Sequence, residues 1–140
     1  MKVIIDTNIL ISALIRDSVT RKIIYESDWE FYYPKNSLEE IEKYKHLIIS
    51  KSQISDQEYD EIFKSLISCL NMISQEAIQD NLKEANTIIG HIDKKDVIFV
   101  AASLNLNKIP IWTEDTHFEK QAAIKILKTK EMLDLFNRIS

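Results

Sequence analysis

Short apolar segments that alternate with helical patterns are the feature that most limits the folds open to this chain. The first segment, Lys2–Ile5, is rich in β-branched residues and predicts a buried strand. Helical patterns follow at Ile9–Leu14 and at Val19–Ser27, with Ser18 as a suitable N-cap, and Phe31–Tyr33 predicts a second strand. Strands alternating with helices favour a parallel sheet covered by helices on both faces, so we expect an α/β fold.

The later elements follow the same alternation. We expect a helix from Leu38 to about Ile49 capped by Asn36 or Ser37, and a helix capped by Ser55 with apolar residues at helical spacing from Tyr59 to Leu70. A brief strand at Ala77–Ile78, a helix at Asn81–Ile89 and a buried helix opened by Asp93 follow. The remaining elements are a strand at Pro110–Thr113, a helical turn at Phe118–Gln121, a strand at Ile124–Leu127 and a last helix, capped by Thr129, through Phe136. No linker or internal repeat is visible, and 140 residues suffice for one sizeable core. A single domain over residues 1–140 is therefore expected.

Composition excludes several classes of function. The chain has one glycine, so it has neither a Walker loop nor a GxGxxG dinucleotide fingerprint. Its one cysteine, Cys69, excludes an internal disulfide and a cysteine-based zinc cluster, and favours a reducing cytoplasm. The net charge of -4 argues against a broad basic surface for nucleic acid, and no apolar run is long enough for a membrane span.

Two acids stand directly beyond predicted strands. Asp6 follows the apolar run VII, and Asp115 follows the run PIWTE. Ligands of an open parallel sheet bind beyond the carboxyl ends of its strands, so the two carboxylates converge if the strands are neighbours. Each acid alone is better explained as a turn or cap residue.

Two helical acids complete a candidate cluster. Glu40 lies on the flank of an apolar helical stripe, below Tyr44, although a partly exposed position at the rim would also explain it. Asp96 lies in the first turn of the buried helix, on its interior side, where a capping role is the alternative. Four converging carboxylates would repel one another unless a cation neutralised them, and oxygen ligands select Mg²⁺ or Mn²⁺. Such sites carry out metal-assisted hydrolysis of phosphodiesters.

The motifs as a set resemble a known family. The segments VIIDTNILISAL, LEEIEKYK, DKKDVIFVAASLNLNKIPIWTEDTHF and LKTKEML resemble PIN-domain nucleases, in particular the VapC-like toxins of prokaryotic toxin–antitoxin systems. The resemblance implies a three-layer α/β/α sandwich with a mostly parallel central sheet. It also implies an endoribonuclease that uses one or two Mg²⁺ or Mn²⁺ ions, works as a homodimer and has a cognate antitoxin protein as partner. The catalytic and metal-binding residues that it implies are Asp6, Glu40 (rather than Glu39), Asp96 and Asp115, with Asn8 and Thr113 orienting the carboxylates.

Other polar residues have weaker assignments. Arg16, Arg21 and Lys22 follow the first helix and could reach an RNA backbone, although a solvated helix face explains them as well. His117 follows Asp115 closely and is a further candidate for a contact with substrate phosphate.

Three alternatives remain at the level of sequence. A PIN fold that serves as a catalytically silent nucleic-acid-binding or scaffold protein is the main one. A two-component receiver needs an acidic pair after its first strand, and a haloacid-dehalogenase-type phosphatase needs Asp-x-Asp there. The DTN sequence that begins at Asp6 fits neither requirement.

Overall fold

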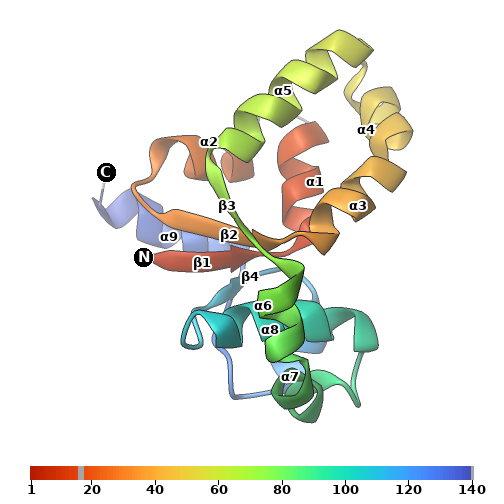
Figure 1. The fold of residues 1–140 in the computed structure, drawn as a ribbon. Coiled ribbons are helices and arrows are strands. Elements are labelled where there is room, and N and C mark those ends of the chain that lie inside the picture. The colour runs from red at the N-terminus through yellow and green to blue at the C-terminus, as the bar shows by residue number, and fades with distance from the viewer. Residues whose placement is uncertain (16–17, 140) are drawn as a thin grey trace.

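A five-stranded parallel sheet forms the centre of the computed structural model, which describes residues 1–15 and 18–139 (Figure 1). The strand order is β3-β2-β1-β4-β5, and each neighbouring pair is parallel. The strands are β1 (Lys2–Ile5), β2 (Glu30–Pro34), β3 (Leu70–Ile73), β4 (Ile111–Trp112) and β5 (Ile126–Leu127).

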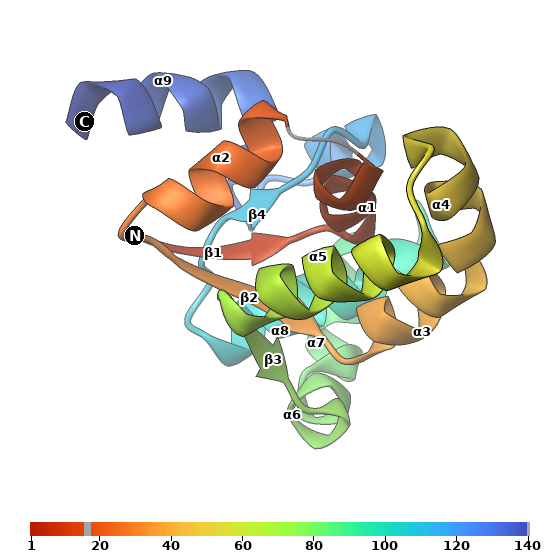
Figure 2. The ribbon, with the colours of Figure 1, turned by 90° about the horizontal axis from the view of Figure 1, so that it is seen from above.

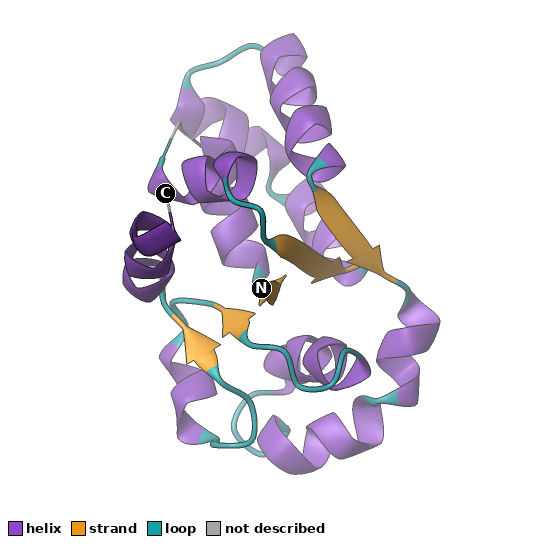
Figure 3. Ribbon diagram, turned by 90° about the vertical axis from the view of Figure 1, so that its left-hand side faces the viewer, coloured by secondary structure: helices purple, strands orange, loops and turns teal. Residues whose placement is uncertain are grey.

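Helices cover both faces of the sheet, which confirms the three-layer α/β/α architecture (Figures 1 and 3). One face carries α1 (Thr7–Ile15), α2 (Val19–Glu26), α3 (Asn36–Lys43), α4 (Lys45–Ser52), α5 (Asp56–Ser68) and α9 (Thr129–Ile139). The other carries α6 (Gln75–Asp80), α7 (Leu82–Ile89), α8 (Val97–Asn105) and the 3₁₀ turns η1 (Lys94–Asp96) and η2 (Thr116–Lys120). Seen from above, α9 lies beside α2 at the end of the molecule opposite α4 (Figure 2). Among the described residues, no helix is long and apolar enough to cross a membrane.

The two cores explain why the strands are apolar on both faces. In β1, Val3 and Ile5 pack with the α1–α5 and α9 layer, whereas Ile4 packs with the α6–α8 layer. Phe31 of β2 and Trp112 of β4 join Val3 and Ile5 in the first core, and both are fully buried. A central parallel strand with helices on both sides is buried on both faces, as Val3, Ile4 and Ile5 are here, and this is the pattern that the apolar run of β1 predicted.

The predicted caps of two helices are confirmed. The Ser18 side chain accepts a hydrogen bond from the Arg21 backbone at the start of α2. At the start of α5, Ser55 and Glu58 form a reciprocal capping box.

The helix expected from Leu38 to Ile49 is two helices. The backbone breaks at Tyr44 (φ -99°, ψ 6°), between α3 and α4. No Gly or Pro stands there, so we attribute the break to the packing of α4 against α1 rather than to local propensity. The expected caps, Asn36 and Ser37, lie inside α3, and the Ser37 hydroxyl forms a buried 2.8 Å hydrogen bond with that of Thr7 instead.

The strand expected at Ala77–Ile78 is also wrong. These residues belong to α6, whose first turn is capped by the Ser74 side chain. The strand in this part of the chain is β3, at the edge of the sheet, where Asn71 and Met72 are exposed. An edge strand with exposed residues in its middle carries a weak apolar signal, which is why the sequence did not reveal it.

Candidate metal centre

Asp6 is the first residue beyond β1 and is almost completely buried. Its backbone N–H donates to the carbonyl oxygen of Trp112 in β4 (3.0 Å), and its own carbonyl accepts from Ile9 and Leu10 in the first turn of α1. Burial raises the pKa of its carboxyl, and the nearby charge of Asp115 adds to the rise. Hydrogen bonds from the Thr113 hydroxyl and the Asn8 backbone act in the opposite direction and lower this pKa.

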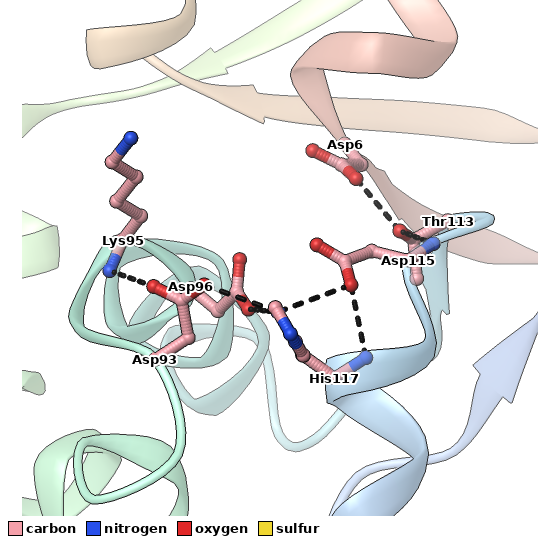
Figure 4. Close-up of polar contacts among 7 residues, drawn as sticks. All are labelled: Asp6, Asp93, Lys95, Asp96, Thr113, Asp115 and His117. Atoms are coloured by element: carbon pink, nitrogen blue, oxygen red, sulfur yellow. Dashed lines mark hydrogen bonds and ion pairs between the residues drawn. The ribbon is translucent and has the colours of Figure 1, made fainter.

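Thr113 connects the acids at the ends of β1 and β4 (Figure 4). Its buried hydroxyl donates to Asp6 Oδ2 (2.7 Å) and accepts from the backbone N–H of Asp115 (3.0 Å). The Asp115 carboxylate in turn caps η2 by accepting the His117 backbone N–H (2.9 Å). One threonine therefore fixes the relative positions of Asp6 and Asp115.

The sheet topology makes this edge a natural binding site. The chain passes from β1 to β2 on one side, while β4 and β5 lie on the other side of β1. The strand order therefore reverses between β1 and β4, and a crevice opens beyond the carboxyl ends of strands at such a switch point. Asp6 and Asp115 follow these two strands.

Asp96 enters the same site from η1, at the start of α8. It is 6% exposed. Burial, followed by the charges of Asp115, Asp93 and Asp6, raises the pKa of its carboxyl to about 7, and His117 partly opposes the rise. Its Oδ2 atom is buried and has no hydrogen-bond partner among the described residues.

Asp93 and His117 lie beside Asp96, and sequence reasoning did not place either in the metal site. Asp93 caps η1 as expected, because its Oδ1 accepts the Lys95 backbone N–H (2.9 Å). Its Oδ2 atom lies 3.1 Å from His117 Nδ1. Potential ligand atoms of Asp93, Asp96 and His117 lie within 4.8 Å of one another. The Asp-x-x-Asp spacing, which puts two acids on one face of a helical turn, is the signal that could have revealed Asp93.

Glu40 joins these acids along one cavity of about 410 Å³. The cavity is lined by Asp6, Asn8, Glu40, Asp93, Asp96 and Asp115, with Tyr44, Leu47, Ile98 and Phe99 among its apolar residues and Lys51 and Lys95 among its basic ones. Glu40 is exposed in α3 and contributes to the wall, whereas Glu39 is not part of the lining. Figure 4 shows the carboxylates of Asp6, Asp96 and Asp115 directed toward a common space.

The remaining candidates are less closely tied to the cavity. Asn8 lines it, but the Asn8 backbone rather than its side chain acts on Asp6. The Arg21 guanidinium donates to the carbonyls of Ala13 (2.8 Å) and Leu14 (3.4 Å), so it satisfies carbonyl groups at the C-terminal end of α1. Lys22 is exposed on α2, and Arg16 lies outside the described residues.

The donor set suits a hard divalent cation. Five carboxylates line the cavity, those of Asp6, Glu40, Asp93, Asp96 and Asp115. The pKa values of Asp6 and Asp96 are raised, chiefly by burial, so the hydrogen bonds and charges of the chain compensate their charged forms only in part. The unpartnered Asp96 Oδ2 is a buried acceptor that a cation would satisfy. The residues present therefore fit the metal that the sequence motifs implied.

Comparisons with known proteins place the chain in a family. The sequence model of the PIN domain matches residues 4–136. The chain belongs to the PIN-domain family. This confirms the family resemblance that the sequence motifs indicated, and PIN domains are generally metal-dependent nucleases.

A solved structure agrees with this PIN fold. The chain is similar to one in the crystal structure of VapBC2 from Rickettsia felis bound to a DNA fragment from their promoter. The TM-score is 0.64 at 16% identity, and the match covers 91% of this chain and 98% of the other. No curated protein sequence matches this PIN domain significantly.

Proposed function

We propose that residues 1–140 act as a single-domain, Mg²⁺- or Mn²⁺-dependent endoribonuclease that hydrolyses RNA phosphodiester bonds. The observation that carries this proposal is the convergence of Asp6, Glu40, Asp96 and Asp115 on one cavity at the β1–β4 switch point. The proposal assigns metal binding and catalysis to these four residues. Burying several carboxylates together is costly, and the arrangement is stabilised when a divalent cation occupies it.

The residues have separable roles in the proposed reaction. A bound divalent ion supplies charge neutralisation at the phosphate and activation of a water molecule. Asp6 and Asp115 hold their positions through the Thr113 hydroxyl, so they present oxygens from a rigid strand end. Lys51 and Lys95 supply positive charge on an otherwise acidic cavity wall, where an RNA strand must approach. Hydrolysis by a water molecule needs no covalent protein intermediate.

A cleavage assay tests the proposal. Purified protein is expected to cut RNA in Mg²⁺ or Mn²⁺, to stop when chelator is added and to resume when the metal is restored. Asp6→Asn is expected to abolish cleavage, because it removes a charge without removing the hydrogen-bond acceptor for Thr113. Cleavage that persists in chelator would point to a metal-free mechanism and would contradict the proposal.

The proposed biological setting is a toxin–antitoxin pair in the cytoplasm. The structural similarity to a chain of a VapBC2 complex supports a cognate antitoxin protein as partner, and we also propose a homodimer as the working form. The test is co-expression with the product of any adjacent small reading frame, followed by purification and sizing. A stable complex that suppresses RNA cleavage is expected. An adjacent product that neither binds nor inhibits would count against the toxin assignment and leave the nuclease assignment standing.

The alternative is a catalytically silent PIN fold that binds nucleic acid or acts as a scaffold. All four acids implied by the family are present, which favours the enzyme. RNA binding without cleavage in any divalent metal, unchanged in Asp6→Asn, would favour the alternative.

A further inference from the structure

The Nδ1 atom of His117 lies close to three carboxylates but makes no hydrogen bond to any of them. It lies 3.1 Å from Asp93 Oδ2, 3.3 Å from Asp115 Oδ1 and 3.8 Å from Asp96 Oδ2. Both Nδ1 and Asp96 Oδ2 are buried, yet neither has a hydrogen-bond partner within residues 1–15 and 18–139. Two buried polar atoms therefore lie 3.8 Å apart, near enough for an ion pair when the imidazole is protonated, but neither makes a hydrogen bond (Figure 4).

These separations also match those expected of ligands around a shared ion. Metal–ligand bonds of about 2.0–2.2 Å with angles between 90° and 110° put neighbouring ligand atoms roughly 3.0–3.5 Å apart. The distances from His117 Nδ1 to the oxygens of Asp93 and Asp115 fall in this range, and that to Asp96 exceeds it slightly.

The local hydrogen bonds leave the required atoms available. Asp93 uses Oδ1 to cap η1, which holds the side chain in place while its Oδ2 faces His117. The His117 backbone N–H donates a hydrogen bond to the Asp115 carboxylate, which holds the start of η2 in place beside the imidazole. The ligand atoms thus come from two short turns that are each stabilised internally.

We propose that Asp93, Asp96 and His117 form a mixed nitrogen–oxygen position for a transition-metal ion at one end of the acidic cavity. This assignment rests on the proposed function, in which the cavity holds a divalent cation. Asp96 belongs both to this mixed ligand set and to the four acids of the proposed nuclease site. An imidazole nitrogen favours Mn²⁺, and still more Zn²⁺, over Mg²⁺, which prefers oxygen ligands. The chain therefore binds Mn²⁺ at this position in preference to Mg²⁺.

Pulsed electron paramagnetic resonance of bound Mn²⁺ tests this directly. The full chain, without a histidine tag, is loaded with Mn²⁺ and no RNA. Wild-type protein is expected to show ¹⁴N coupling from a coordinated imidazole, and His117→Ala is expected to lose it. His46→Ala is the matched control, because His46 is exposed on α4, and it should retain the coupling.

A second variant keeps the test valid if His117→Ala folds poorly. Asp93→Asn retains an oxygen to cap η1 and removes the ligand charge, so it should lower Mn²⁺ affinity about tenfold or more while changing Mg²⁺ affinity less. Calorimetric titration with each metal measures both.

Two results would overturn the inference in different ways. Bound Mn²⁺ without ¹⁴N coupling in the wild type, or equal Mn²⁺ affinity in wild type and Asp93→Asn, would reject the mixed position and leave the carboxylate site intact. Failure of the wild type to bind Mn²⁺ would reject the metal site of the proposed function as well.

Discussion

Asp96 shows how the surroundings of one side chain change its chemistry. Its pKa rises from an ordinary value of 3.8 to about 7 because the carboxyl is buried and lies near Asp115, Asp93 and Asp6. Between these two pH values the folded chain holds more protons at this carboxyl than the unfolded chain does. The stability that this carboxyl contributes is therefore present below pH 3.8 and is lost as pH rises through 7.

We accordingly expect metal-free protein to lose stability through this residue as pH rises from about 4 to about 7. The Asn side chain in Asp96→Asn cannot ionise. The free energy of unfolding of this variant, relative to that of the wild type, should therefore increase as pH rises across this range. Urea denaturation of both proteins in chelator measures the difference. A difference that does not change with pH would show that Asp96 is charged throughout.

Thr113 is the residue whose loss should most disturb the site without removing an acid. Thr113→Val leaves the buried Asp6 Oδ2 without its donor and the Asp115 N–H without its acceptor, so we expect a loss of about 1–3 kcal/mol in stability. Cleavage should fall roughly 10–100-fold because the carboxylates lose their orientation. Thr87→Val is the control, since that exposed hydroxyl bonds only within α7 and its loss should cost less than about 0.5 kcal/mol. Equal effects of the two substitutions would rule out an orienting role for Thr113.

At the scale of elements, the capping box at the start of α5 should contribute to stability but not to catalysis. Ser55 and Glu58 stabilise the start of this helix and are absent from the cavity lining. Ser55→Ala should lower the free energy of unfolding by about 0.5–2 kcal/mol and leave RNA cleavage unchanged at temperatures where the protein is folded. Denaturant melts and the cleavage assay measure the two effects, and a large loss of activity would show that α5 contributes to the site.

Elements with strong local signals were predicted well from the sequence. β1 has a compact apolar run, and α2 and α5 have apolar periodicity with recognisable caps. The limits of β1 and α2 agree with the structure within a residue, and α5 begins directly after its predicted cap. The break at Tyr44 and the strand β3 depend on packing against distant segments. Neither has a Gly, a Pro or a clean alternation to mark it, so local sequence could not reveal them.

The candidate site likewise contains residues that local sequence reveals and residues that only long-range packing brings together. Asp6 and Asp115 could be inferred because the carboxyl ends of parallel strands meet at one edge. The approach of His117 to Asp93 depends on how η2 packs beside η1, and no spacing in the sequence encodes that contact. The resemblance to PIN domains named acids from four separate segments, and the structure brings all four to one cavity.

At the scale of the whole molecule, the fold brings like charges together at the point where strand order reverses. The β1–β4 edge receives Asp6 and Asp115 from the sheet, Glu40 from α3 and Asp96 from the turn before α8. In the absence of a cation this concentration of carboxylates opposes folding, whereas a cation bound only by the folded state stabilises it.

Thermal melting of wild type and Asp6→Asn, each with and without Mn²⁺, tests this account most directly. At a Mn²⁺ concentration of about 100 times Kd, the wild type should gain about 2.7 kcal/mol, a rise in Tm on the order of 5–10 °C. Asp6→Asn should show little gain, and without metal it should be as stable as the wild type or slightly more so, because one repelling charge is gone. A wild type insensitive to Mn²⁺, together with an Asp6→Asn protein destabilised by about 1–2 kcal/mol, would instead identify Asp6 as a turn or cap residue and contradict the metal site.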